Sequence, residues 1–361
     1  MKKKEYIIPI FIPFLGCPHD CAFCNQVKIT NYRDKVNKEN IIEEIEKNLN
    51  YFPDNDNLKE IAFFGGSFTA LPLETMVAYL EIAKSYKDKR IIDRIRLSTR
   101  PDCINNFILD VLKDYGVDII ELGIQSLDQE ILDANERGHR VEDSYEASSL
   151  IKERGFTLGH QIMPGLFKDS FDKTIKTAID SANMEPDLVR IYPTLVIKET
   201  KLEQYFNQGS YKPLSLDEAV KLSAIAYMIY RAKNINVIRI GLQVTENIND
   251  KEDVVGGPFH SAIRQLVESY IYRLYIEKLI KENNIEDEAR IYTDDRSISI
   301  IAGNKKSNKK YFYDRYGLKL NFESSCESPY METKGTKIDL DIDGFIYNYV
   351  KENYGGDLKL G

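Results

Sequence analysis

Hydrophobic and polar positions follow a repeating pattern from about residue 5 to residue 245. Short apolar runs are each followed by a longer stretch in which apolar residues recur every three to four positions. The runs predict buried strands, and the longer stretches predict amphipathic helices. The predicted strands are Tyr6–Phe11, Glu60–Phe64, Arg94–Ser98, Ile119–Ile124, Thr157–Met163 and Leu188–Tyr192, with a further candidate at Val237–Leu242.

Six strand-then-helix units in series predict an α/β fold with a parallel sheet and right-handed crossovers. The length of this part fits a partial or complete TIM-type (β/α) barrel, whose chemistry lies at the C-terminal ends of the strands. An open, doubly wound sheet is the main alternative.

The alternation stops after residue 250. We expect a long helix at Ala262–Lys281, three short strands and a closing helix near Phe345–Lys351. The three strands are predicted at Ser297–Ile301, Leu318–Phe322 and Lys337–Ile342. The sequence therefore predicts a barrel over residues 1–250 and a small α+β region over residues 251–361, packed against each other.

Composition narrows the class of protein. The 361 residues carry a formal net charge of −8, and 43% of them are hydrophobic, which is typical of a globular chain. The sequence contains neither an apolar run long enough to span a bilayer nor a signal-peptide cleavage site, so we expect a cytoplasmic protein. The acidic balance argues against a generally basic nucleic-acid binder, although it permits a local basic patch.

Three cysteines lie close together directly after the first predicted strand, as Cys17, Cys21 and Cys24. A structural zinc site normally takes four protein ligands, whereas Cys103 and Cys326 are isolated in the sequence. Three thiolates suit a [4Fe-4S] cluster with one iron left open for a small molecule. The spacing therefore favours a catalytic cluster, with zinc as the alternative.

This cysteine loop, with the aromatic Phe23 before its third cysteine, resembles the radical S-adenosylmethionine (SAM) superfamily. The resemblance implies that the open iron binds SAM and that an electron, from a donor of flavodoxin or ferredoxin type, cleaves it. The product is a 5′-deoxyadenosyl radical that abstracts hydrogen. The cofactor carries this chemistry, and the protein positions the reactants and excludes water.

The resemblance also implies a set of SAM contacts near the ends of the strands. These are Phe23, Gly65, Gly66, Ser67, Ser98, Arg100, Gln125, Arg137, Gln161 and Met163. The two glycines let the backbone approach a ligand, although a plain turn would also use them. Arg100 could hold a carboxylate or pair with Asp102 instead. We interpret His160 as a core residue and His139 as a structural partner.

Several segments resemble the radical SAM half of the Elongator catalytic subunit over roughly residues 5–245. They are Ser98–Asp102, Ile120–Ser126, Arg137–His139, Tyr192–Val196 and Tyr211–Pro213. The resemblance implies modification of the wobble uridine of tRNA, and we expect Tyr192 and Lys198 to contact the substrate. Only about 100 residues follow the barrel, without an R-x-x-G-x-G/A run, so acetyl-CoA chemistry is not expected from this chain alone.

A basic stretch interleaved with aromatic residues occupies positions 303–316. Such a stretch can bind RNA phosphates and stack on bases, but a solvated helix face with buried aromatics is the simpler interpretation. Two other functions remain open: radical chemistry on a metabolite or protein side chain, and a non-catalytic iron–sulfur or zinc module that binds RNA.

Overall fold

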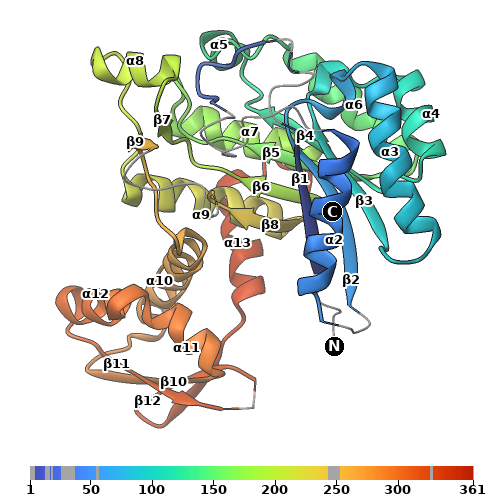
Figure 1. Ribbon diagram of the computed structural model, residues 1–361. Helices are drawn as coiled ribbons and strands as arrows, with labels where there is room; N and C mark the ends of the chain where they lie inside the picture. Colours follow the sequence, from blue (N-terminus) through green and yellow to red (C-terminus); the bar gives the residue numbers. More distant parts are fainter. Residues whose placement is uncertain are drawn as a thin grey trace.

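The computed structural model describes residues 5–12, 17, 19–25, 37–53, 57–242, 253–325 and 328–360. Its main feature is a seven-stranded parallel sheet that curls into a partial barrel (Figure 1). The strands are β1 (Glu5–Ile12), β2 (Leu58–Gly65), β3 (Arg94–Thr99), β4 (Ile119–Gln125), β5 (Thr157–Ile162), β6 (Leu188–Ile191) and β8 (Asn236–Ile240). All seven predicted strands are confirmed.

The strands lie side by side in chain order, β1-β2-β3-β4-β5-β6-β8. A doubly wound sheet would place its first strand in the interior of the order, with neighbours on both sides, so this alternative is wrong. The sheet is instead wound in one direction, as in a TIM-type barrel that has not closed. All carboxyl ends of the strands therefore meet at one edge.

Helices on the outside of the sheet connect these strands. They are α2 (Lys38–Tyr51), α3 (Leu73–Asp88), α4 (Asn106–Asp114), α5 (Gln129–Ala134), α6 (Val141–Glu153), α7 (Phe171–Asn183), α8 (Lys201–Asn207) and α9 (Leu216–Ala232). Two single 3-10 turns, η1 (Phe68–Ala70) and η2 (Pro101–Cys103), follow β2 and β3. The short strands β7 (Val196–Ile197) and β9 (Val254–Gly256), which are far apart in the chain, form a separate antiparallel pair.

The C-terminal region carries its own four-stranded sheet. Its elements are α10 (Ile263–Asn283), β10 (Glu288–Thr293), α11 (Asp295–Ala302), η3 (Asn304–Lys306), α12 (Ser307–Tyr316), β11 (Lys319–Ser324), β12 (Tyr330–Thr333), β13 (Thr336–Asp339) and α13 (Ile342–Tyr354). The strand order is β11-β10-β12-β13. The predicted long helix, the closing helix and two of the three strands are thus present.

The strand predicted at Ser297–Ile301 is wrong, because this segment forms helix α11. The alternation of serine and isoleucine indicates a strand when read alone. Asp294, however, caps the helix by accepting hydrogen bonds from the backbone N–H groups of Arg296 and Ser297. Gly303 then ends the helix with a positive φ of 79°.

The core is divided into two large clusters. One lies between strands β1–β4 and helices α2, α3, α4 and α6, around fully buried residues such as Phe63 and Leu97. The other joins β5, β6, β8, α7 and α9 to the C-terminal elements α10, α13, β10 and β11. Tyr230 of α9, Ile276 of α10 and Phe345 of α13 belong to this second cluster. The barrel and the C-terminal region therefore share one hydrophobic core.

The proposed boundary at residue 250 lies outside the described residues, and so does Cys326. Among the helices that the structure describes, none combines the length and apolar character needed to cross a membrane.

Candidate metal centre

The cysteine loop lies at the carboxyl end of β1, where the backbone is held on two sides. The Ala22 N–H donates to the Asn135 carbonyl, just after α5, at 2.9 Å. The Ala22 carbonyl accepts from the N–H of Leu202, in α8, at 2.7 Å. A turn within the loop is closed by the Cys24 N–H, which donates to the Cys21 carbonyl at 2.9 Å. The residue that follows α5 and a residue of α8 thus both hold the loop.

The three thiols influence one another electrostatically. Burial, followed by the charges of Cys21 and Cys17, raises the pKa of Cys24 to about 12. Burial also raises the pKa of Cys17. The hydrogen bond from the Ser67 N–H lowers this pKa, but by less than burial raises it. Thiols in this setting give up their protons when a metal replaces them, because metal binding requires the thiolate form.

Within the described ranges, no three His, Cys, Asp or Glu side chains converge closely enough to hold a single ion. A cubane cluster does not require such convergence, since each cysteine binds a different iron atom. The donor set of three thiolates therefore fits an iron–sulfur cluster.

Arg137 connects the cysteine loop to the barrel interior. Its Nη1 donates to the Cys21 sulfur at 3.4 Å, and its Nη2 donates to the Gly123 carbonyl at 2.7 Å. The guanidinium is only 7% exposed, and its Nε has no partner among the described residues. A Cβ added to Gly123 would lie 2.9 Å from Nη2, so glycine makes room for this contact. The resemblance implied that Arg137 contacts SAM, and the structure shows that it also contacts a cysteine.

The glycine turn after β2 crosses the end of β1. Gly65 has a φ of 108°, and an added Cβ would lie 2.9 Å from the Ile12 carbonyl oxygen. The same oxygen accepts from the Gly66 N–H at 2.8 Å. Ser67 is buried, and its backbone N–H donates a hydrogen bond to the Cys17 sulfur. Its hydroxyl accepts a hydrogen bond from the Arg100 N–H at 3.1 Å. In the described structure this turn therefore supports the cysteine loop directly.

Arg100 pairs with Asp102, which is one of the two alternatives given in the sequence analysis. Its Nε and Nη2 both donate to the Asp102 carboxylate at 2.9 Å. The side chain is 2% exposed, and Nη1 has no partner in the described part of the chain. Ser98 lies two residues earlier on β3 and is half-buried. The orphan N–H groups of Arg100 and Arg137 are donors available to an anionic ligand near the cysteines.

Gln125, Gln161 and Met163 come together at the ends of β4 and β5. The Gln161 amide donates to the Gln125 side chain at 3.2 Å, and the Met163 N–H donates to the Gln125 carbonyl at 2.8 Å. Gln125 has a φ of 67°, a left-handed conformation that is unfavourable for a non-glycine residue. Backbone strain of this kind concentrates at functional sites.

The two histidines differ in their hydrogen bonding. His160 is fully buried between the hydroxyls of Ser148 and Ser181, at 3.0 and 2.9 Å, which confirms it as a core residue. His139 is 2% exposed, and neither ring nitrogen has a partner among the residues described. Burial, followed by the charges of Arg137 and Arg100, lowers the pKa of His139 to about 3. Its imidazole is therefore neutral.

The two residues expected at the substrate lie in different settings. Tyr192 is half-buried at the end of β6, where its hydroxyl accepts from Arg190 Nη1 at 3.3 Å. The Lys198 side chain is exposed, and its backbone carbonyl accepts from the Asn25 amide at 3.1 Å. The structure thus brings the Lys198 backbone to the cysteine loop.

A buried network of charged side chains fills the barrel below these residues, and the sequence analysis did not predict it. Glu60 of β2 and Glu121 of β4 lie 2.6 Å from the guanidinium of Arg96 of β3. Arg190 of β6 contacts the other side of Glu121 at 2.5 Å. Burial alone would raise the pKa of Glu121, but Arg190 and Arg96 outweigh it and the pKa is lowered. The sequence feature that could have predicted this network is the presence of charged residues within otherwise apolar strand segments.

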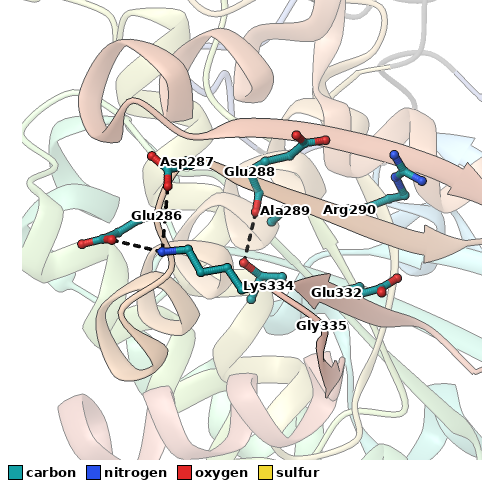
Figure 2. Close-up of a pocket in the computed structure, with 9 residues that line it drawn as sticks. Glu286, Asp287, Glu288, Ala289, Arg290, Glu332, Lys334 and Gly335 are labelled. Carbon is teal, nitrogen blue, oxygen red and sulfur yellow. Dashed lines mark hydrogen bonds and ion pairs between the residues drawn. The ribbon is translucent and has the colours of Figure 1, made fainter.

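The described part of the surface carries two pockets of interest. One lies at the edge of the C-terminal sheet, where Lys334 pairs with Glu286 and Asp287 at 3.2 and 3.9 Å (Figure 2). Its residues come only from the C-terminal region, so it is separate from the cysteine loop. The other lies between the loops that follow β5 and α8 and includes Tyr211, whose hydroxyl donates to the Gly165 carbonyl at 2.6 Å.

Sequence comparison identifies two domain families in the chain. Residues 11–178 match the radical SAM superfamily, and residues 186–273 match the radical SAM C-terminal domain. An uncharacterized protein of Methanocaldococcus jannaschii is 32% identical over 237 residues, which cover 61% of this chain and 70% of that protein.

Relatives with printed functions match over shorter stretches. The tRNA uridine(34) acetyltransferase of Methanocaldococcus jannaschii is 31% identical over 178 residues, covering 48% of this chain and 32% of that protein. Elongator complex protein 3 of Saccharomyces cerevisiae is 30% identical over 185 residues, or 46% of this chain and 33% of that protein. The chain thus spans about a third of the length of each of these two relatives.

Among solved structures, the archaeal Methanocaldococcus infernus Elp3 with an N-terminal deletion matches with a TM-score of 0.59 at 23% identity. The match covers 76% of this chain and 64% of that one, and it agrees with the partial barrel. Together with the cysteine loop and the family matches, these findings show that the chain belongs to the radical SAM superfamily.

Proposed function

We propose that this protein binds a [4Fe-4S] cluster through Cys17, Cys21 and Cys24, binds SAM beside it, and modifies a uridine of tRNA. The observation that carries the cluster assignment is the cysteine loop itself, whose Cys21 sulfur accepts a hydrogen bond from the buried Arg137. When bound, the cluster and SAM would supply a 5′-deoxyadenosyl radical that abstracts hydrogen from the substrate.

The surrounding residues would hold these groups in place. Arg137 and Arg100 act on the cysteine loop as positive charges, which stabilise the anionic thiolate of Cys17 and leave donors for the SAM carboxylate. The hydrogen bond from the Ser67 N–H also stabilises the thiolate of Cys17. Gln125 and Gln161, joined by their amides, offer polar groups for the ribose hydroxyls, and Met163 offers an apolar surface for the adenine.

Water must be kept from a reactive radical. The charge network around Glu121 fills the barrel interior, so we propose that substrate enters only at the carboxyl ends of the strands. Tyr192 lies there, and Lys198 lies beside the cysteine loop. We propose that these two residues contact the substrate.

The assignment of tRNA is supported by relatives named for tRNA uridine(34) and for the Elongator complex. Because tRNA and small electron-transfer proteins are cytoplasmic, we propose that the enzyme works there with a donor of flavodoxin or ferredoxin type. Acetyl-CoA is not included in the proposal.

The test is a comparison of modified nucleosides in bulk tRNA from cells with the gene, without it, and with a Cys21→Ala copy. We expect one uridine-derived nucleoside to be present only with the intact gene. An identical nucleoside profile in all three strains would contradict the tRNA assignment and would favour a metabolite or protein side chain as substrate.

A further inference from the structure

Helix α12 and the turn before it present a row of cations to solvent. This surface, here named the α12 cationic face, consists of four lysines and one tyrosine: Lys305, Lys306, Lys309, Lys310 and Tyr313. Lys310 and Tyr313 are three residues apart in α12, a spacing that places side chains along one side of a helix, and Lys306 is the residue directly before the helix. Lys305, Lys306 and Lys310 are exposed, Lys309 is half-buried, and the Tyr313 side chain is 58% exposed.

The lysines of this face are not neutralised. Within the part of the chain that the structure describes, no ion pair involves Lys305, Lys306, Lys309 or Lys310. Lys334 in the same region, by contrast, pairs with two carboxylates (Figure 2). The α12 cationic face is thus a local positive surface on a chain whose net charge is −8.

Two of these lysines lie in a strained turn. Lys305 and Lys306 have φ values of 51° and 62°, both in the left-handed region. This conformation costs roughly 1 kcal/mol for each residue with a Cβ. Two successive non-glycine residues in it are unusual, and strain of this kind is found where side chains are held for binding.

The helix below the face is firmly anchored. Asn308 is fully buried, and its amide donates to the carbonyls of Ser269 and Ile301, each at 2.9 Å. Arg273 Nε donates to the Asn308 side-chain oxygen at 2.9 Å. The lysines therefore stand on a rigid support, which lowers the entropy lost when a ligand binds.

The aromatic residues of α12 indicate which polyanion fits. Phe312 is fully buried, and the hydroxyls of Tyr311 and Tyr316 both donate to Glu277. Only the Tyr313 ring is exposed among the lysines. A membrane-binding helix needs a broad apolar face, and α12 has none to offer. Lysines with one exposed aromatic ring suit RNA, whose phosphates they bind and whose bases stack on the ring.

We propose that the α12 cationic face binds the sugar–phosphate backbone of RNA, with Tyr313 stacking on a base. This inference rests on the proposed tRNA function and names a docking surface for that substrate. In Figure 1, α12 lies at the opposite end of the molecule from α5 and α8, which hold the cysteine loop. The face would therefore contact a part of the tRNA remote from the modified base.

The test is the affinity of the anaerobically reconstituted full chain for fluorescently labelled, full-length tRNA, measured across a salt series. The variants are Lys306→Ala with Lys310→Ala, and separately Tyr313→Ala. The matched control replaces Lys281 and Lys351, two exposed lysines on α10 and α13, with alanine. Circular dichroism and 5′-deoxyadenosine formation from SAM check that each variant is folded and that its barrel is intact.

We expect the double variant to bind tRNA about tenfold more weakly at low salt. Its plot of log affinity against log salt should also be shallower by about 1.5 to 2 units, because two phosphate contacts are lost. Tyr313→Ala should weaken binding without changing this slope, since stacking releases no counterions. The control pair should behave as the wild type.

Wild-type binding that survives unchanged in the double variant, or an equal loss in the control pair, would overturn the inference and leave the tRNA assignment intact. Unchanged tRNA binding combined with lost binding to phosphatidylglycerol vesicles would likewise overturn it in favour of a membrane site. If the wild type itself binds tRNA no better than an unrelated acidic protein, the proposed substrate fails first.

Discussion

At the scale of single residues, Arg137 links the cysteine loop to the barrel. One nitrogen of its guanidinium donates to the Cys21 sulfur, and another is fixed on the Gly123 carbonyl. A buried positive charge that donates to a cluster ligand stabilises the more negative, reduced form of a cluster. We therefore assign Arg137 a positioning and tuning role in addition to its proposed contact with SAM.

Replacement of Arg137 tests this role. A charge-assisted hydrogen bond contributes about 1.5 kcal/mol, which corresponds to about 60 mV for one electron. Arg137→Gln should make the midpoint potential of the reconstituted cluster more negative by about this amount. The measurement is a potentiometric titration followed by electron paramagnetic resonance. Arg140→Gln, at an exposed arginine paired with Asp143, is the control; equal potentials in the two variants would refute the tuning role.

His160 supports a prediction about pH. Burial lowers the pKa of His160 to about 3, whereas an unfolded histidine titrates near 6.5. Between these values the unfolded chain binds a proton that the folded chain does not, so the free energy of unfolding falls as the pH falls. His160 should contribute about 1.4 kcal/mol per pH unit to this decrease.

Urea denaturation between about pH 6 and pH 4.5, followed by circular dichroism, measures this effect. His160→Gln should be less stable at neutral pH, because two buried serine hydroxyls lose their partner. Its stability should, however, depend less steeply on pH than that of the wild type. Parallel curves for the two proteins would show that His160 is protonated in the folded state or contributes nothing to the acid response.

At the scale of elements, four strands are tied together by buried charges as well as by apolar contacts. Glu121 on β4 lies between Arg96 on β3 and Arg190 on β6. Arg96 also pairs with Glu60 on β2, and all of these side chains are nearly inaccessible to solvent. A buried ion pair adds little net stability over apolar packing, but removing one partner leaves uncompensated charge. We infer that this network fixes the curvature and closes the barrel interior below the site.

The network makes a clear prediction for stability. Glu121→Gln removes the carboxylate shared by two arginines and should lower the free energy of unfolding by about 3 to 5 kcal/mol. Glu5→Gln, which breaks the exposed pair with Arg94, should cost less than about 1 kcal/mol. Urea denaturation of both variants provides the measurement. If the two variants lost a similar free energy of unfolding, burial would not decide how much these ion pairs contribute to stability.

At the scale of the whole molecule, the C-terminal region is joined to the barrel by a shared core. Helix α9 of the barrel packs against α10 and α13, and one cluster of buried residues includes all three helices. A shared core favours cooperative unfolding of the two parts. The α12 cationic face is therefore held in a fixed position relative to the barrel, as a docking surface for a large substrate requires.

A cavity in the shared core should affect both parts. Ile276→Ala in α10 truncates a side chain that is 1% exposed and should lower the free energy of unfolding by about 2 to 5 kcal/mol. Hydrogen exchange should then show faster opening in β6 and α13 together. Ile42→Ala, at a position 42% exposed, is the control and should change little. Faster exchange confined to the C-terminal region would show that the two parts unfold independently.

The sequence predicted most of the scaffold because strand and helix periods are carried by many residues at once. All seven barrel strands follow from that pattern, whereas their order along the sheet came from the structure, which excluded the doubly wound alternative. The segment at Ser297–Ile301 was wrong because four alternating residues cannot distinguish a strand from a capped helix turn.

Local contacts of single polar side chains were less predictable. The sequence predicted that Arg137 and Arg100 lie near the site, but it did not predict the hydrogen bond from Arg137 to Cys21. For Arg100 it offered pairing with Asp102 as one of two alternatives and could not choose between them. Such contacts depend on which way a side chain turns, and tertiary packing decides this. The charge network around Glu121 was missed for a related reason, since its partners lie on three strands far apart in sequence.

The most direct test of radical SAM chemistry in this protein measures 5′-deoxyadenosine formed from SAM by the anaerobically reconstituted protein under strong reductant. We expect product from the wild type and from Cys103→Ser, whose cysteine lies outside the loop, and no product from Cys21→Ala. Absence of product from the wild type, or equal product from Cys21→Ala, would contradict this assignment.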